Sequence, residues 1–327
     1  DHLNRARKSC LSVLDVTGIG LSERGGAKFF ELLIEGKCDF ITSLHLGSND
    51  LTDQAVGRLM VETMRSETCN IATLDINNNE IGAGILSQAI KYNKSLTSLD
   101  ITGNPQIEDD GLGMIGDLLL QPQCSCRLRF LNCFAFEVKR DDPEGLKLYD
   151  ETIGKGALQL LCGIFKYNDL IEKLDLRGRG VEAEAAKVLA TAVKHNKTFK
   201  SITLSDNPIA DVSLYTAGKE PMDINGLKDL AEAVNTNPSL LSITLDGGKL
   251  PVDELKGGKG EKPVRFLDMS KKSLGYVSAI FVGTLLRGNE KLNELILHSN
   301  ELTPNGVTFI VKQLRPTLKQ LDISNTV

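Results

Sequence analysis

Apolar residues recur along the chain in a phrase of nine residues, in which the first, fourth and sixth positions are apolar and the ninth is often asparagine. Clear copies occupy residues 41–49, 71–79 and 292–300. Because successive side chains of a strand point to opposite faces, this alternation predicts one short strand in each copy. Eleven copies are present, and their first residues are Leu11, Ile41, Ile71, Leu96, Leu128, Ile171, Phe199, Leu240, Val264, Leu292 and Leu318.

Segments with apolar residues at helical spacing follow the strands, for example residues 53–64 and 183–193. A strand and a helix in each repeat predict parallel strands joined by right-handed crossovers. Because a helix is wider than a strand, stacking these units predicts a horseshoe with a parallel sheet on the concave side and helices on the convex side.

The phrase, the repeat length of about 31 residues and lead-in segments such as residues 91–100 resemble the ribonuclease-inhibitor-like class of leucine-rich repeat proteins. The resemblance covers residues 11–326 and implies an α/β leucine-rich repeat solenoid. We expect a single repeat domain over residues 1–327. We also expect it to be part of a longer chain, because the last phrase has no helix after it; the alternative is that a partner caps this end. In the family the ninth-position asparagine bonds the loop backbone, and it is present here at Asn49, Asn79, Asn104, Asn207 and Asn300.

Three repeats depart from the regular length. Extra residues follow the strand near 137–153 and 210–223, and a glycine-rich segment at 247–262 replaces a helix. We expect all three to project from one rim of the solenoid; the alternative is neutral insertion into tolerant loops. The glycine run at 257–260 lacks the spacing of a phosphate-binding loop and favours a flexible turn. The candidate rim residues for partner binding are Lys139, Arg140, Leu146, Leu148, Tyr149 and Tyr215.

The third, fifth and seventh positions of each phrase should form the concave face. Six of the eleven fifth positions are aspartate, so this face should repel nucleic acid and attract basic patches of a protein. The alternative is that the carboxylates only keep the strand face solvated. The candidate partner-binding residues are Asp15, His45, Asp75, Asp100, Phe130, Asn132, Phe134, Asp175, Arg177, Asp246, Phe266, Asp268, Glu294, His298 and Asp322.

Composition narrows the function classes. The net charge of −5 gives no global attraction to nucleic acid or to an anionic membrane, and no apolar run is long enough to span a bilayer. Seven cysteines without CxxC spacing favour reduced thiols in the cytoplasm, with the nucleus as the alternative. Two glycosylation triplets, at Asn93 and Asn196, are no more than chance provides in a chain of this length.

Candidate chemistry is sparse. His45 should lie between Asp15 and Asp75, which favours a pH-sensitive contact and leaves a weak metal site as an alternative. His298 has serines nearby but no ordered acid and oxyanion hole, so we expect no catalytic residue, no resident metal and no cofactor.

We therefore expect a non-enzymatic protein-interaction module that uses its acidic concave face and its rim. The alternatives are a structural subunit of a cytoskeletal or ciliary assembly and, by resemblance alone, a GTPase regulator like the activators of Ran.

Overall fold

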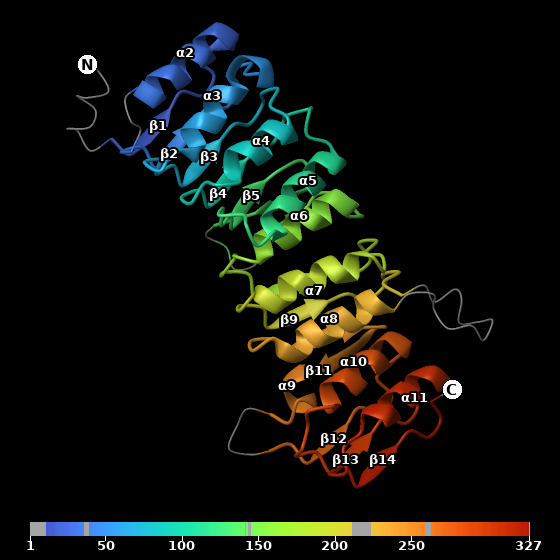
Figure 1. Ribbon diagram of the computed structural model, residues 1–327. Helices are drawn as coiled ribbons and strands as arrows, with labels where there is room; N and C mark the ends of the chain where they lie inside the picture. Colours follow the sequence, from blue (N-terminus) through green and yellow to red (C-terminus); the bar gives the residue numbers. More distant parts are fainter. Residues whose placement is uncertain are drawn as a thin grey trace. The chain divides into compact units, whose positions relative to one another are not determined.

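The computed structural model describes residues 11–35, 39–140, 142, 145–210, 224–258 and 263–326. The chain divides into two compact units, Asp1–Asn168 (unit 1) and Asp169–Val327 (unit 2). Within each unit strands and helices alternate along the chain, and the helices lie on one side of the sheets (Figure 1). The strand-and-helix repeat predicted from the phrase is therefore confirmed. No helix in these ranges is long and apolar enough to cross a membrane.

Unit 1 contains one sheet of seven strands in chain order. The first five strands are parallel and the last two are antiparallel. The strands are β1 (Val13–Asp15), β2 (Ser43–His45), β3 (Thr73–Asp75), β4 (Ser98–Asp100), β5 (Phe130–Asn132), β6 (Phe136–Val138) and β7 (Leu146–Leu148). Its helices are α2 (Ser22–Glu35), α3 (Asp53–Arg65), α4 (Ala83–Ile90), α5 (Asp109–Leu120) and α6 (Lys155–Phe165).

Unit 2 contains a four-stranded and a three-stranded sheet. The first consists of β8 (Lys173–Asp175), β9 (Ser201–Thr203), β10 (Ser242–Leu245) and the antiparallel β11 (Gly248–Pro251). The second consists of β12 (Phe266–Asp268), β13 (Glu294–Ile296) and β14 (Gln320–Asp322), which are parallel. The helices are α7 (Ala185–His195), α8 (Asn225–Thr236), α9 (Val252–Leu255), α10 (Tyr276–Leu286) and α11 (Thr303–Gln313).

Each of the eleven strands expected from the phrase is present, and each begins at the third position. The eleven repeat strands are parallel within each sheet, and the described strands form three sheets. The segment expected to project as a rim loop at 137–153 contributes β6 and β7, which extend the sheet of unit 1. The segment at 247–262 forms β11 and the short α9 up to residue 258. Residues 211–223 and 259–262 lie outside the described residues.

The ninth-position asparagines hold the turns after the strands. Asn79, which is 3% exposed, donates hydrogen bonds to the carbonyls of Leu46, Ile76 and Asn77 at 3.0 Å. Its side-chain oxygen accepts from the backbone N–H groups of Asn49 and Leu51. One side chain thus satisfies buried backbone groups of two consecutive repeats.

The two hairpins occur where this asparagine is missing. Phe136 and Gly248 occupy the ninth position of their phrases, and each begins a strand that turns back on its predecessor. In the first hairpin the N–H of Cys133 donates to the carbonyl of Phe136 at 3.0 Å. Antiparallel pairing therefore satisfies backbone groups that the asparagine would otherwise bond.

A second set of buried asparagines precedes the strands, and it includes both glycosylation triplets. Asn93 and Asn196 are 2% and 1% exposed. The amide of Asn93 donates to the carbonyl of Met64 at 2.7 Å, and its oxygen accepts from the N–H of Leu96 at 2.6 Å. Burial and hydrogen bonding leave no accessible acceptor amide at either triplet in the folded chain.

Helices α5 and α6 approach each other closely through glycines. A Cβ placed on Gly116 would lie 2.5 Å from the carbonyl carbon of Gln159 in α6, and one on Gly113 would lie 3.2 Å from the Cα of Gly156. The carboxylate of Asp109 accepts from the N–H groups of Gly156 and Ala157 at 2.8 and 2.9 Å. This contact seats α6 directly beside α5 although β6 and β7 intervene in the sequence.

Candidate protein-binding site

Seven polar residues form one row across the sheet of unit 1, on the face opposite the helices. Each strand contributes one residue, and neighbouring members are direct register partners. The polar row consists of Asp15, His45, Asp75, Asp100, Asn132, Glu137 and Lys147. The predicted order of its first five members is confirmed by this register. The last two were not predicted, because the insert was expected to be a loop.

Hydrogen bonds join parts of the polar row. The Nδ1 atom of His45 lies 3.5 Å from Oδ2 of Asp75, and the side-chain amide of Asn132 donates to Oδ2 of Asp100 at 2.9 Å. The hydroxyl of Tyr149 lies 3.2 Å from Oδ1 of Asn132 and 3.4 Å from Oε2 of Glu137. Since an ionised carboxylate only accepts hydrogen bonds, the network is interrupted between Asp75 and Asp100.

A hollow of about 560 Å³ opens over this interruption. Asp75, Asp100 and Asn132 lie on its floor, and the residues after β6 form a wall that includes Lys139 and Arg140. The four carboxylates of the lining belong to Asp75, Asp100, Glu137 and Asp142. They outnumber the cations of the lining, Lys139 and Arg140, and Lys139 already lies 3.7 Å from Glu137. The hollow therefore brings predicted concave-face and predicted rim residues into one site with an acidic floor.

Phe130 was expected to be an exposed anchor, and this is wrong: it is 5% exposed. The guanidinium groups of Arg129 and Arg140 lie 5.4 and 5.6 Å from its ring centroid. These cation–π contacts cover the ring. Phe134, at the tip of the β5–β6 hairpin, is 48% exposed and keeps the predicted accessibility.

The insert residues take several roles. Leu146 and Leu148 pair across the antiparallel ladder with Val138 and Phe136, which are buried, so both half-buried leucines lie on the core side of the sheet. The exposed Tyr149 links the insert to the polar row. Partial desolvation, followed by the negative charge of Glu137, raises the pKa of Tyr149 above its usual value. Tyr215 lies outside the described residues.

The repeated fifth-position aspartate has a structural role in every copy. One carboxylate oxygen accepts from the N–H two residues later at 2.8–3.0 Å, which forms a local turn at the end of the strand. This bond holds the pKa of Asp15, Asp268 and Asp322 below the usual value. Turn formation accounts for the recurrence of aspartate, so only the aspartates placed beside further chemistry indicate a binding site.

The remaining predicted concave-face residues lie in unit 2. Asp175 and Arg177 belong to the repeat of β8 and are exposed. Asp246 was expected on the sheet face, and this is wrong: its carboxylate accepts from the N–H groups of Gly275 and Ser278 at the start of α10. The other candidates lie in or beside the three-stranded sheet, and they are Phe266, Asp268, Glu294, His298 and Asp322.

Ser43, His45 and Asp75 form an arrangement that the sequence analysis missed. The hydroxyl of Ser43 lies 2.9 Å from Nε2 of His45, whose Nδ1 lies 3.5 Å from Asp75. Hydroxyl, imidazole and carboxylate follow one another here as they do in the catalytic triad of a serine hydrolase. However, the N–H groups of Thr42 and Ser43 are both bonded to the carbonyl of Ser12, so they offer no oxyanion hole beside the hydroxyl. The sequence did contain a signal for this arrangement: Ser43 and His45 are two residues apart on one strand, so their side chains lie on the same face.

The described cysteines are also poorly suited to chemistry. Cys69, Cys124, Cys126, Cys133 and Cys162 are buried and free. Burial raises the pKa of Cys126 to about 12 and that of Cys133 to about 11, which opposes formation of the nucleophilic thiolate. Within the described ranges, the structure contains no group of three or more metal-ligating side chains.

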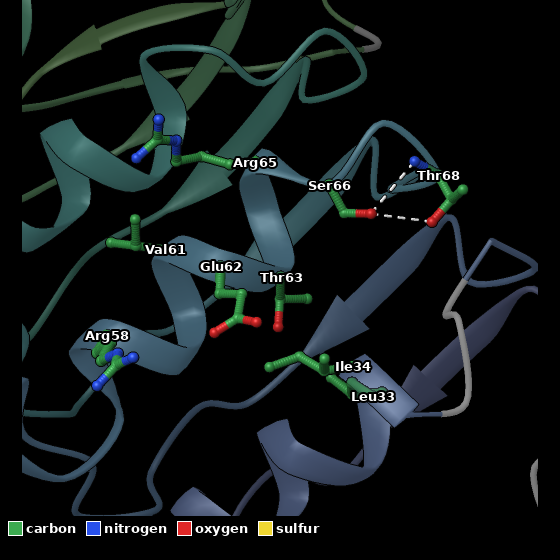
Figure 2. A pocket seen from close by; sticks show the side chains of 9 residues that line it. All are labelled: Leu33, Ile34, Arg58, Val61, Glu62, Thr63, Arg65, Ser66 and Thr68. Atoms are coloured by element: carbon green, nitrogen blue, oxygen red, sulfur yellow. Dashed lines mark hydrogen bonds between the residues drawn. The ribbon is translucent and has the colours of Figure 1, made fainter.

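A second hollow lies on the helix side of unit 1, between the C-terminal parts of α2 and α3 (Figure 2). Leu33, Ile34 and Val61 supply apolar surface, and Arg58 and Glu62 are exposed at its edge. Its volume is about 710 Å³. It brings together no polar network comparable to the row on the sheet, so the hollow at Asp75 and Asp100 is the stronger candidate for specific binding.

Comparisons with known proteins agree with the repeat architecture. A family model described as "Leucine Rich repeat" matches residues 37–60 and 92–116. The chain is 26% identical to the ribonuclease inhibitor of Mus musculus over 313 residues, which is 84% of this chain and 68% of the relative. It is 25% identical to NACHT, LRR and PYD domains-containing protein 5 of Homo sapiens over 218 residues, 62% of this chain, but spans only 18% of that protein.

Among solved structures, the leucine-rich repeat-containing protein LegL7 of Legionella pneumophila is 17% identical, with a TM-score of 0.31. The match covers 74% of this chain and 68% of that structure. The eleven repeat strands, the buried ninth-position asparagines and the sequence matches agree with one another. The chain therefore has a leucine-rich repeat fold and resembles the ribonuclease-inhibitor-like class.

Proposed function

We propose that the chain is a non-enzymatic protein-interaction module that binds a basic segment of a protein partner in the hollow of unit 1. The observation that carries the proposal is the interruption of the polar row between Asp75 and Asp100. These carboxylates are register partners on adjacent strands, and parallel strands lie about 4.8 Å apart. A lysine or arginine side chain would donate to both and complete the network.

The energetics favour a cation at this position. Each carboxylate has one oxygen in its local turn and the other beside His45 or Asn132. No lysine or arginine of the described residues forms an ion pair with either carboxylate. A hydrogen bond to a charged group contributes about 1.5–3 kcal/mol. Arginine fits well because its planar fork presents several N–H donors to paired carboxylate oxygens.

The comparisons support a protein as the ligand. The ribonuclease inhibitor that the chain matches acts, by its name, on another protein. The absence of an accessible oxyanion hole at Ser43 and the raised thiol pKa values argue against catalysis by these residues. We place the module in the cytoplasm, with the nucleus as the alternative, because the described cysteines are buried free thiols suited to a reducing compartment.

The test is selection of binders from a random peptide library displayed on phage, with the 327-residue chain as bait. Asp75→Asn combined with Asp100→Asn removes both charges and keeps an oxygen for each local turn. The matched control is Asp175→Asn combined with Asp268→Asn, which makes the same change at fifth positions in unit 2.

We expect arginine and lysine to be enriched on the unmodified chain and on the control, and this enrichment to disappear with the Asp75/Asp100 variant. Individual peptides, measured by fluorescence anisotropy, should lose about tenfold in affinity. Equal enrichment on both double variants would overturn the proposal.

A further inference from the structure

An apolar hollow adjoins the acidic one. Its volume is about 710 Å³, and it is lined by Phe134 together with Pro105, Ile107 and other residues between β4 and α5. Phe134 is the aromatic side chain of this lining, and nearly half of its surface is accessible at the β5–β6 tip. An exposed aromatic side chain beside a concave apolar surface is a common anchor for a protein partner.

Residues that are neighbours in the sequence line the two hollows. Asp100 lines the acidic hollow and the next residue, Ile101, lines the apolar one. Likewise, at the end of β5, Asn132 lines the acidic hollow and Phe134 lines the apolar one. Tyr149 also connects them, because its hydroxyl bonds Asn132 while its N–H donates to the carbonyl of Ala135, the residue after Phe134.

The charge at the edge of the apolar hollow suits the same partner. Glu108 lies in its lining and is exposed, and Asp110 is exposed at the start of α5. Acidic side chains on this edge disfavour an acidic partner and favour basic residues on either side of an apolar one. Both hollows therefore select for the same kind of segment.

We infer that one extended partner segment occupies both hollows, with a basic side chain between Asp75 and Asp100 and an aliphatic or aromatic side chain against Phe134. This inference rests on the proposed function. In an extended segment, side chains two or four positions apart share a face, whereas side chains three apart point to opposite faces. The partner motif is accordingly a basic residue and an apolar residue separated by two or four positions.

The test uses fluorescein-labelled synthetic peptides of glycine and serine that contain one arginine and one phenylalanine, two, three or four positions apart. Reference peptides replace the phenylalanine with glycine. We expect the spacings of two and four to bind about tenfold more tightly than the arginine-only peptide, and the spacing of three to bind no more tightly than it.

Phe134→Ala should abolish the gain from phenylalanine, and Phe134→Leu should retain most of it. Phe266→Ala, which truncates a phenylalanine that is 53% exposed in unit 2, is the matched control and should leave the gain unchanged. Circular dichroism of the whole chain verifies folding of each variant.

The outcomes separate the two proposals. If the arginine-only peptide binds through Asp75 and Asp100 but phenylalanine adds nothing, or its gain survives Phe134→Ala, the two-hollow inference is overturned and the acidic site stands. A tighter complex at spacing three also overturns the extended geometry. If binding of the arginine-only peptide is indifferent to Asp75→Asn with Asp100→Asn, the proposed function itself fails.

Discussion

Replacement of Gly116 by alanine measures how strongly the close contact between α5 and α6 supports unit 1. A Cβ at this position would lie 2.5 Å from the carbonyl carbon of Gln159 and 2.7 Å from its oxygen, and would also meet the backbone nitrogen of Leu160. All of these are backbone atoms of α6. The overlap is therefore relieved only by moving the helix.

The magnitude follows from the geometry. Carbon atoms in good contact are about 3.5–4.0 Å apart, so α6 has to withdraw by about 1 Å. Overpacking of this kind costs about 1–3 kcal/mol, and the higher helix propensity of alanine returns about 1 kcal/mol. We expect a net loss of about 0–2 kcal/mol in the free energy of unfolding.

Gly84→Ala is the matched control. Gly84 is an exposed residue of α4, and a Cβ built there would meet nothing within 4 Å. The same substitution should therefore stabilise the chain by about 0.5 kcal/mol. Urea unfolding followed by circular dichroism compares the two variants, and hydrogen exchange of α5 and α6 localises the effect to unit 1. A Gly116→Ala variant as stable as Gly84→Ala would refute the close helix contact.

Three further predictions concern the buried groups. Asn79→Ala should lower the free energy of unfolding by about 3 kcal/mol, because five hydrogen bonds to backbone groups are lost, whereas the exposed Glu80→Ala should change it by less than about 0.5 kcal/mol in the same urea titration. Phe136→Ala should cost about 3–5 kcal/mol, since the ring is fully buried; an unchanged melting temperature would mean that the insert does not pack into the core. Iodoacetamide at pH 8 should leave Cys126 and Cys133 unmodified until urea is added, because burial raises the thiol pKa values to about 12 and 11, and alkylation of either thiol in the folded chain, detected by mass spectrometry, would contradict this.

The repeat phrase was sufficient to predict the eleven repeat strands, and with them the neighbours of His45, Asp75 and Asp100 in the polar row. Such residues are predictable because their positions depend on a periodic core. The same periodicity misplaced Asp246, whose strand is followed by a hairpin that directs the carboxylate to the start of α10. The turn after the strand determines where this carboxylate lies, and the nine-residue phrase carries no information about that turn.

The sequence also contains a signal for the hairpin strands β6 and β11, but the repeat period alone does not reveal its meaning. Phe136 and Gly248 replace the asparagine that bonds the turn after a regular strand. Ile19 and Lys272 also replace it, yet their repeats form no hairpin, since Leu21 and Leu274 donate to the asparagines of the next repeats. Whether a hairpin forms therefore depends on the repeat that follows. Likewise, the cover over Phe130 includes Arg140, which belongs to the insert. Contacts of this kind require the three-dimensional structure.

The antiparallel strands of the insert also bear on the order in which unit 1 folds. Parallel partners such as Thr73 and Ser98 belong to successive repeats, whereas Asn132 pairs with Glu137 within a single hairpin. Closing the shorter loop costs less chain entropy, and repeat arrays grow outward from whichever segment forms first. We expect the strands β5–β7 to form a nucleus from which order spreads back toward β1. During synthesis, the earlier repeats would then complete their folding only after the insert has left the ribosome.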